Sequence, residues 1–309
     1  MNKKKIILIT PRFKGYEIDI FNEFKKQYSN ILLIRELPSR LQFLNFIWFQ
    51  YLIFYFKLIK PSFLIVINGK SLSKKLLSKL NSFVNNQSLI YIWDSVLNYD
   101  FRNKLGVFDV SATFDIEDSK EIENLKYRPT FFTKIDSIPK KEKIIFGLYG
   151  GGFSYRYEFL RTIDFEFINE KGYQTKFLFY NPSKYFLFKF SKKYLKVTFL
   201  MQLISNKKYL NILKKSKIII DIQSPTQSGY TMRLLDGLAN NCVVITNNQF
   251  THLFDNEAQK RIVIFDSKIE RNHIEKALKI SSLESNFKLD KYFSLSEFVN
   301  ELLNYVKFG

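Results

Sequence analysis

Cysteine and histidine are scarce in this sequence, with one cysteine and two histidines among 309 residues. The single cysteine, Cys242, lies in an apolar run that predicts a buried strand, so a disulfide framework is excluded. A reducing cytoplasm is the simplest setting for such a chain. His252 and His273 are far apart and lack ligand spacing, so the chain has no zinc motif.

The N-terminus, MNKKKIILIT, does not have the pattern of a signal peptide. The apolar run after the lysines is too short, and Pro11 and Arg12 end it. We therefore interpret residues 3–10 as the first strand of an α/β domain.

The most apolar stretch, LQFLNFIWFQYLIFYFKLIK at residues 41–60, approaches the length of a membrane span. Polar residues interrupt this stretch: Gln42, Asn45, Gln50 and Lys57. A transmembrane helix would also separate two predicted strands of one sheet, so it is the least favoured of three interpretations. The others are a buried crossover helix, and a helix that packs inward while exposing Phe, Tyr and Trp48 to a membrane interface.

Basic residues outnumber acidic ones, 48 against 29, which gives a net charge of +19. Nucleotide bias in an AT-rich genome would produce this excess, since it favours Lys, Phe, Ile and Asn codons together. Whatever its origin, such a surface is attracted to anionic lipid or to polyphosphates. Nucleic acid is the rival partner, but the lysines are spread along the chain and no recognition helix or RNA-binding signature is present. We therefore expect an anionic membrane surface as a partner and no nucleic acid.

Strands and helices alternate along the chain, which is typical of parallel sheets covered by helices on both faces. In the first half we expect strands at 5–10, 31–35, 63–67, 88–93, 110–114 and 127–131, and helices near 16–27, 41–59, 70–84 and 116–124. In the second half we expect a first strand within IIFGLYGGG at 144–152, further strands at 175–180, 196–200, 217–222, 242–246 and 261–265, and helices near 155–170, 206–215, 229–240, 269–280 and 294–307. A polar linker at 134–143 divides the halves into domains 1–138 and 139–309, and the final helix could pack back on the first domain.

Residues 217–247, KIIIDIQSPTQSGYTMRLLDGLANNCVVITN, form a predicted strand–loop–helix–strand unit. Leu234, Leu235, Leu238 and Ala239 form one apolar helix face, whereas Asp236 lies off it. Such a unit brings a loop and a helix N-terminus to the carboxyl edge of the sheet. Open α/β sheets bind ligands at that edge, and a helix N-terminus offers N–H groups to a phosphate.

This segment resembles the donor-nucleotide site of GT-B glycosyltransferases, many of which carry Glu-x7-Glu before a Pro-Val-Ile-type strand. Asp236 falls on the second Glu and Cys242-Val243-Val244-Ile245 on the strand, but Ser228 replaces the first Glu. The segment SPTQSGYTMR, with IYIWDS at 90–95 and FDVSATFDIEDSKEI at 108–122, is similar to bacterial lipopolysaccharide and capsule biosynthesis proteins. The resemblance implies two Rossmann-like domains that face a central cleft, and transfer of a sugar from a nucleotide sugar to a lipid-linked or growing surface glycan.

The candidate donor site consists of glycines after the first strand of the second domain and the start of the 229–240 helix. Its residues are Gly150, Gly151, Gly152, Arg156, Ser228, Gly229, Tyr230, Thr231, Arg233 and Asp236. Glycines let the backbone approach an anion, and Arg233 or Arg156 could pair with a diphosphate. The resemblance implies that Asp236 holds the ribose. These residues could also have no ligand. The glycines would then form only a tight turn, and Arg233 and Asp236 would be solvated or ion-paired residues of the helix surface.

A base for the acceptor hydroxyl is expected in the first domain, where Asp94 ends the strand IYIWD and Glu17 and Asp19 follow the first strand. A helix cap for Asp94, and favourable first-turn charges for Glu17 and Asp19, are the structural alternatives. Asp115 is expected to cap the helix that follows it. No metal motif stands out, and GT-B enzymes generally hold the diphosphate without metal, so we predict no metal or other cofactor.

The leading hypothesis is therefore a glycosyltransferase, peripheral on the inner face of the cytoplasmic membrane. A nucleotide-sugar 2-epimerase shares the fold, but it would need acidic and histidine residues in the cleft, and this sequence has only two histidines. A GT-B-like scaffold protein without turnover is permitted by Ser228, and a nucleic-acid-binding protein is the least favoured hypothesis.

Overall fold

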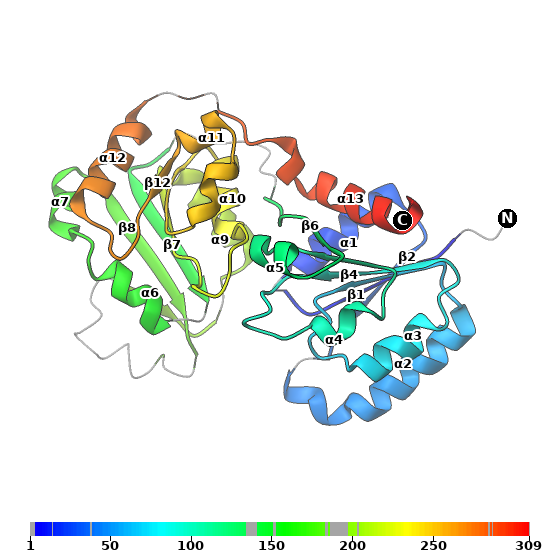
Figure 1. The fold of residues 1–309 in the computed structure, drawn as a ribbon. Coiled ribbons are helices and arrows are strands. Elements are labelled where there is room, and N and C mark those ends of the chain that lie inside the picture. Colours follow the sequence, from blue (N-terminus) through cyan, green and yellow to red (C-terminus); the bar gives the residue numbers. More distant parts are fainter. Residues whose placement is uncertain are drawn as a thin grey trace. The chain divides into compact units, whose positions relative to one another are not determined.

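The computed structural model describes residues 4–13, 15–37, 39–133, 141–150, 153–182, 185, 197–202, 204–283, 285 and 287–308. The chain forms two compact units (Figure 1). The first comprises Met1–Thr130, Thr226–Gly229 and Tyr292–Gly309, and the second comprises Phe131–Pro225 and Tyr230–Lys291. The predicted boundary at residue 138 lies outside the described residues.

The first unit contains a six-stranded parallel sheet in the order β2-β1-β3-β4-β5-β6. Its strands are β1 (Ile6–Thr10), β2 (Ile31–Arg35), β3 (Phe63–Ile67), β4 (Gln87–Ile92), β5 (Val110–Thr113) and β6 (Leu125–Tyr127). β1 and β3 are buried along their whole length, which explains their uninterrupted apolar runs. The order reverses at β1, so the edge beyond the carboxyl ends of β1 and β3 is the expected ligand-binding position.

Helices cover both faces of this sheet (Figure 1). They are α1 (Tyr16–Gln27), the 3-10 helix η1 (Ser39–Leu44), α2 (Asn45–Ile59), α3 (Lys74–Asn81), α4 (Arg102–Leu105), α5 (Ile116–Glu121) and, after η4 (Lys291–Phe293), α13 (Leu295–Phe308). α2 and α3 pack on the face formed by Ile7, Ile9, Leu64 and Val66. α13 packs against α1 and β4, so the end of the chain belongs to the first unit.

The second unit contains another six-stranded parallel sheet, in the order β12-β11-β10-β7-β8-β9. Its strands are β7 (Ile144–Gly150), β8 (Gln174–Tyr180), β9 (Thr198–Leu200), β10 (Ile218–Asp221), β11 (Val243–Thr246) and β12 (Ile262–Ile264). In chain order this is the 3-2-1-4-5-6 arrangement of Rossmann domains, in which the order reverses between β7 and β10. The prediction of two doubly wound α/β sheets is confirmed.

The helices of the second unit are α6 (Phe153–Leu160), α7 (Phe165–Glu170), α9 (Asn206–Lys215), α10 (Met232–Ala239), η3 (Gln249–Leu253), α11 (Asn256–Gln259) and α12 (Arg271–Ser282). α6, α7 and α12 contribute to one aromatic-rich core that contains Phe159, Phe167 and Phe177. α10 packs on β10 and β11, and α9 packs on β7.

Some predicted elements differ from the observed ones. The helix expected at 155–170 is two helices, because a turn follows α6 and Asp164 caps α7 by accepting from the Phe167 N–H. The strand expected at 127–131 is β6, which ends before Pro129, a residue without an N–H for the ladder. The helix expected at 70–84 begins after its cap, Ser73.

α2 combines core packing with exposure. Its side chains at Leu52 and Phe56 are fully buried and Trp48 is half-buried, whereas Phe46 is 72% and Phe54 66% exposed. No helix in the described part of the chain is long and apolar enough to cross a membrane. α2 is therefore a crossover helix that is buried on one side only, and its other side exposes aromatic side chains. Contact of this exposed side with a membrane stays a prediction.

Candidate functional site

Arg233, on the first turn of α10, lies at the carboxyl ends of β7 and β10, where the strand order of the second sheet reverses. Its Nε donates to Asp221 Oδ1 (3.0 Å), Nη1 to the Leu148 carbonyl (2.8 Å) and Nη2 to the Ile222 carbonyl (3.3 Å). The side chain is 16% exposed, so the guanidinium is held rigidly but still reaches the surface.

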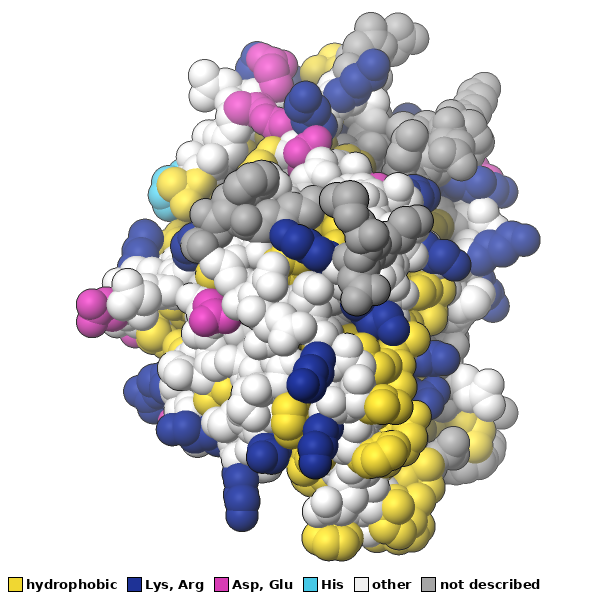
Figure 2. All heavy atoms as spheres, turned by 90° about the vertical axis from the view of Figure 1, so that its right-hand side faces the viewer, with side chains coloured by type: hydrophobic (Ala, Val, Ile, Leu, Met, Phe, Trp, Pro, Cys, Tyr) yellow, Lys and Arg dark blue, Asp and Glu magenta, His cyan; other side chains and the backbone are white. Residues whose placement is uncertain are grey.

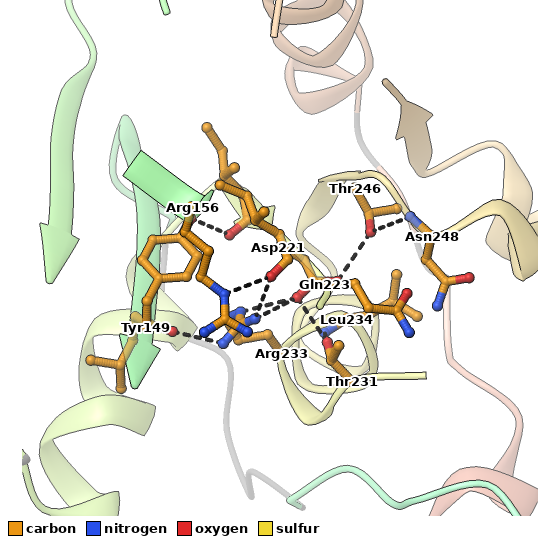
Figure 3. Close-up of polar contacts among 12 residues, drawn as sticks. Tyr149, Arg156, Asp221, Gln223, Thr231, Arg233, Leu234, Thr246 and Asn248 are labelled. Carbon is orange, nitrogen blue, oxygen red and sulfur yellow. Dashed lines mark hydrogen bonds and ion pairs between the residues drawn. The ribbon is translucent and has the colours of Figure 1, made fainter. Parts of the chain in front are cut away.

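Asp221, the last residue of β10, organises this region and was missed in the sequence. Its fully buried carboxylate accepts from Arg233, from Thr231 Oγ1 (2.8 Å) and from Thr246 Oγ1 (3.0 Å) (Figure 3). A carboxylate without exposure requires such partners. The signal that could have found it is an acidic residue within the apolar run Ile218–Ile220 and Ile222.

Arg156 of α6 brings a second positive charge to the same place. Its Nε donates to the Ile222 carbonyl (3.0 Å), the same carbonyl that also accepts from Arg233 Nη2. Burial and, after it, the charge of Arg233 lower the pKa of Arg156 to about 10. The Tyr149 ring lies beside both guanidinium groups, 5.0 Å from that of Arg233 and 6.0 Å from that of Arg156 (Figure 3). Two arginines with one carboxylate leave a net positive site that a bound anion would stabilise.

Two other parts of the predicted donor-nucleotide site lie next to these arginines: the end of β7 and the start of α10. Gly150 ends β7 and is exposed, whereas Gly151 and Gly152 lie outside the described residues. Thr231 is the N-cap of α10: its Oγ1 accepts from the Leu234 N–H (3.1 Å) while donating to Asp221. The helix therefore starts at Met232, later than the sequence suggested.

Ser228, Gly229 and Tyr230 are each held by other contacts. Ser228 belongs by its contacts to the first unit, where its N–H and Oγ donate to the two oxygens of Asp115 (2.8 and 2.5 Å). A Cβ on Gly229 would lie 2.2 Å from the Phe114 carbonyl oxygen, so only glycine fits there. The buried Tyr230 ring stacks on Phe254, with centroids 4.4 Å apart. Asp115 also caps α5, as expected.

Asp236 does not have the position that a ribose ligand needs. It is fully buried, and its oxygens accept from the Thr133 N–H (2.7 Å) and the Tyr209 hydroxyl (3.1 Å). Burial raises the pKa of Asp236 to about 7. The helical pattern predicted an accessible side chain because it could not show that α9 and residue 133 cover this side of α10.

Among the predicted bases, Asp94 follows β4 at the carboxyl edge of the first sheet and is partly exposed. Its Oδ1 accepts from the Ser95 N–H (3.1 Å) and its side chain is 21% exposed, so it stabilises a turn rather than capping a helix. Glu17 is buried, and its carboxylate accepts from the Phe13 and Gly15 N–H groups (both 2.9 Å), so it stabilises the loop before α1. Asp19 is half-buried on α1.

The carboxyl edge of the first sheet also holds polar groups that the sequence did not point to. Within the described residues, Thr10 Oγ1, Glu36 Oε1 and Asn68 Oδ1 are buried without a hydrogen-bond partner. They follow or end the adjacent strands β1, β2 and β3. Burial raises the pKa of Glu36, whose other oxygen accepts from Ser71. In the described part of the chain no group of three or more His, Cys, Asp or Glu side chains could hold a metal ion.

No protein-family model and no curated protein matches this sequence. Solved structures do resemble the fold over nearly the whole chain. One is an α-glucosyltransferase in complex with UDP-glucose and DNA containing an abasic site, with 14% identity, a TM-score of 0.59 and coverage of 98% of this chain and 95% of that one. The lipopolysaccharide outer core galactosyltransferase WaaB has 12% identity, a TM-score of 0.53 and coverage of 97% and 98%.

A third similar structure is the UDP-GlcNAc 2-epimerase of Methanocaldococcus jannaschii in complex with UDP-GlcNAc and UDP, with 10% identity, a TM-score of 0.53 and coverage of 99% and 100%. The chain therefore has the GT-B fold, as the resemblance in its sequence implied.

Proposed function

We propose that this protein is a glycosyltransferase that moves a sugar from a nucleotide-sugar donor to a lipid-linked or growing surface glycan, such as lipopolysaccharide or capsule. The observation that carries the proposal is the pair Arg156 and Arg233 at the point where the second sheet reverses its strand order. Ligands of doubly wound sheets bind at that point, and guanidinium groups recognise phosphate oxygens.

The chemistry of these two residues suits a diphosphate leaving group. As the bond between the sugar and the diphosphate breaks, negative charge develops on the phosphate oxygens. Arg233 is fixed in advance by Asp221 and two carbonyl groups, so little reorganisation is needed when that charge appears. The exposed Gly150 at the end of β7 would let the diphosphate approach the backbone. Asp94 is the candidate base, since its partly exposed carboxylate follows β4 at the carboxyl edge of the first sheet.

Nucleotide binding by variants of the two arginines tests the donor site. Calorimetry with UDP, GDP and CMP should find one nucleotide that binds, and Arg233→Ala should weaken its binding by about 1.5–3 kcal/mol, the value of a charged hydrogen bond. Arg156→Ala should weaken it as well. Arg161→Ala is the matched control, because Arg161 is 59% exposed and pairs with Glu158. Unchanged affinity in both site variants would refute the site.

The acceptor side of the proposal depends on the exposed side of α2. Large apolar side chains on α2 and on the end of η1 are 58–78% exposed; they are Phe43, Phe46, Ile47, Tyr51, Phe54 and Leu58. No Asp or Glu occurs between Glu36 and Asp94, whereas that stretch contains Arg40, Lys57, Lys60, Lys70, Lys74, Lys75 and Lys79. Figure 2 shows hydrophobic side chains gathered on the lower part of one face, with Lys and Arg beside them.

An exposed apolar stripe beside cations suits an anionic lipid surface, because aromatic side chains insert at the interface and lysines attract the head groups. We therefore place the protein on the inner face of the cytoplasmic membrane, without crossing it. Flotation with anionic vesicles at low salt should recover the protein, and high salt should weaken its binding. Phe46→Ser with Phe54→Ser should abolish flotation, whereas Leu283→Ser, at a side chain that is 66% exposed in the second unit, should not. A protein that stays unbound at low salt would refute this location.

Product analysis separates the alternatives. Epimerisation of UDP-GlcNAc without an acceptor would favour an epimerase, the activity named for one similar structure. Nucleotide binding without transfer or epimerisation would favour a scaffold protein. Because another similar structure contains DNA, a duplex belongs in the acceptor panel, and glycosylated DNA would replace the glycan as acceptor.

A further inference from the structure

A groove of about 580 Å³ runs between α2 and α3 in the first unit. Phe49 and Ile53 of α2 and Leu76 of α3 are among the apolar side chains that line it. Lys75, Ser78 and Lys79 of α3 also line it, and all three are exposed. Its volume lies within the range of small-molecule sites, and its lining combines an apolar wall with cations on one side.

The position of the groove relates it to the edge where we place the acceptor. Ser73, another lining residue, caps α3 shortly after β3 ends at Ile67, so this end of the groove lies near the carboxyl edge of the first sheet. Phe46, on the first turn of α2, belongs both to the lining and to the exposed stripe. A molecule in the groove would therefore extend from the apolar stripe toward the sheet edge that carries Asp94.

The charges decide between the possible occupants. A second copy of this chain would bring one acid-free, lysine-rich surface against another, and like charges would oppose the contact. A neutral hydrocarbon would leave Lys75 and Lys79 without a role. A hydrocarbon chain that carries a phosphate uses both the apolar wall and the cations, because an ammonium group binds phosphate as a point charge.

We propose that the α2–α3 groove binds the hydrocarbon chain of a phosphate-bearing lipid, and that Lys75 and Lys79 contact its phosphate. The proposal rests on the proposed glycosyl transfer and specifies its acceptor: a sugar attached through phosphate to a single lipid chain. The chain leaves the bilayer along the stripe on α2 and enters the groove, which directs the sugar toward the edge of the first sheet.

Binding of a fluorescent long-chain alkyl phosphate, below its micelle concentration, tests the groove in the full-length protein. Ser78→Trp should fill the groove and weaken binding at least about tenfold, since Ser78 is exposed and its replacement does not disturb the core. Lys75→Ala with Lys79→Ala should weaken it about 25-fold, at about fivefold for each lysine. The matched controls are Ser296→Trp on α13 and Lys74→Ala, at an exposed residue of α3 that does not line the groove.

The corresponding alkyl alcohol should bind more weakly than the phosphate, and with the same affinity in the wild type and in the double lysine variant. The proposal is overturned if Ser78→Trp leaves the affinity for the alkyl phosphate unchanged. It is also overturned if the wild-type protein does not bind the alkyl phosphate below its micelle concentration. Sedimentation that finds a dimer which Ser78→Trp dissociates overturns it as well, because the groove would then belong to a second copy. Nucleotide affinity is measured on the same samples: if it stays intact while alkyl phosphate does not bind, the groove fails and the donor site stands.

Discussion

Replacement of Asp221 by asparagine should destabilise the second unit more than any other single change at the candidate donor site. Asp221 is fully buried and receives hydrogen bonds from Arg233, Thr231 and Thr246. The amide that replaces the carboxylate has the same shape but carries no charge and turns one acceptor into a donor. Arg233 would then keep its positive charge, mostly buried, without a counter-ion.

The expected loss is about 3–5 kcal/mol, the cost of removing one partner of a buried ion pair. The lower end applies here, because Arg233 is 16% exposed and still donates to the carbonyls of Leu148 and Ile222. Arg233→Met in the Asp221→Asn background should recover part of the loss, since it removes the unpaired charge. A coupling energy of about 1–3 kcal/mol between the two substitutions is expected.

Urea unfolding followed by two probes measures this effect. Both tryptophans, Trp48 and Trp93, lie in the first unit, so their fluorescence reports on that unit, whereas far-UV circular dichroism reports on both. The loss should appear in the dichroism transition. Asp266→Asn is the control, because Asp266 is an exposed carboxylate of the same unit. A loss below about 1 kcal/mol, as for a surface residue, would refute the role of Asp221.

Three further outcomes are expected. Because the pKa of Asp236 is raised to about 7 in the folded protein, the unfolded chain loses this proton at lower pH than the folded one, and the free energy of unfolding falls between about pH 4 and pH 7 at about 1.4 kcal/mol per pH unit. Asp236→Asn should flatten that slope in urea titrations. An unchanged slope would contradict the burial of this carboxyl. Gly229→Ala should destabilise the first unit by about 1–3 kcal/mol in tryptophan-detected unfolding, because its Cβ would meet the Phe114 backbone; a neutral effect would mean that the segment moves freely. Sugar transfer should survive EDTA, and a complete loss that Mg²⁺ restores would show that the diphosphate needs a metal.

The fold of both units followed from local patterns in the sequence. Apolar runs at 5–10 and 217–222 predicted buried parallel strands, and the structure has β1 (Ile6–Thr10) and β10 (Ile218–Asp221) there. Helix ends depend on single capping side chains, so Asp115 was recognised correctly as a cap. Asp164 was missed, because a cap within a continuous helical pattern does not change the periodicity.

At the candidate site, the sequence indicated Arg233 because it lies one turn into a helix that follows a buried strand, and a helix N-terminus has the same chemistry in any fold. It did not indicate Asp221, the partner that fixes Arg233, and it placed Asp236 toward the ligand although that carboxylate is buried. These outcomes depend on tertiary structure, because the partner of a side chain is set by strand order and by the elements that cover its helix. Residues 133 and 209, which enclose Asp236, are 103 and 27 positions away from it, beyond the reach of any local pattern.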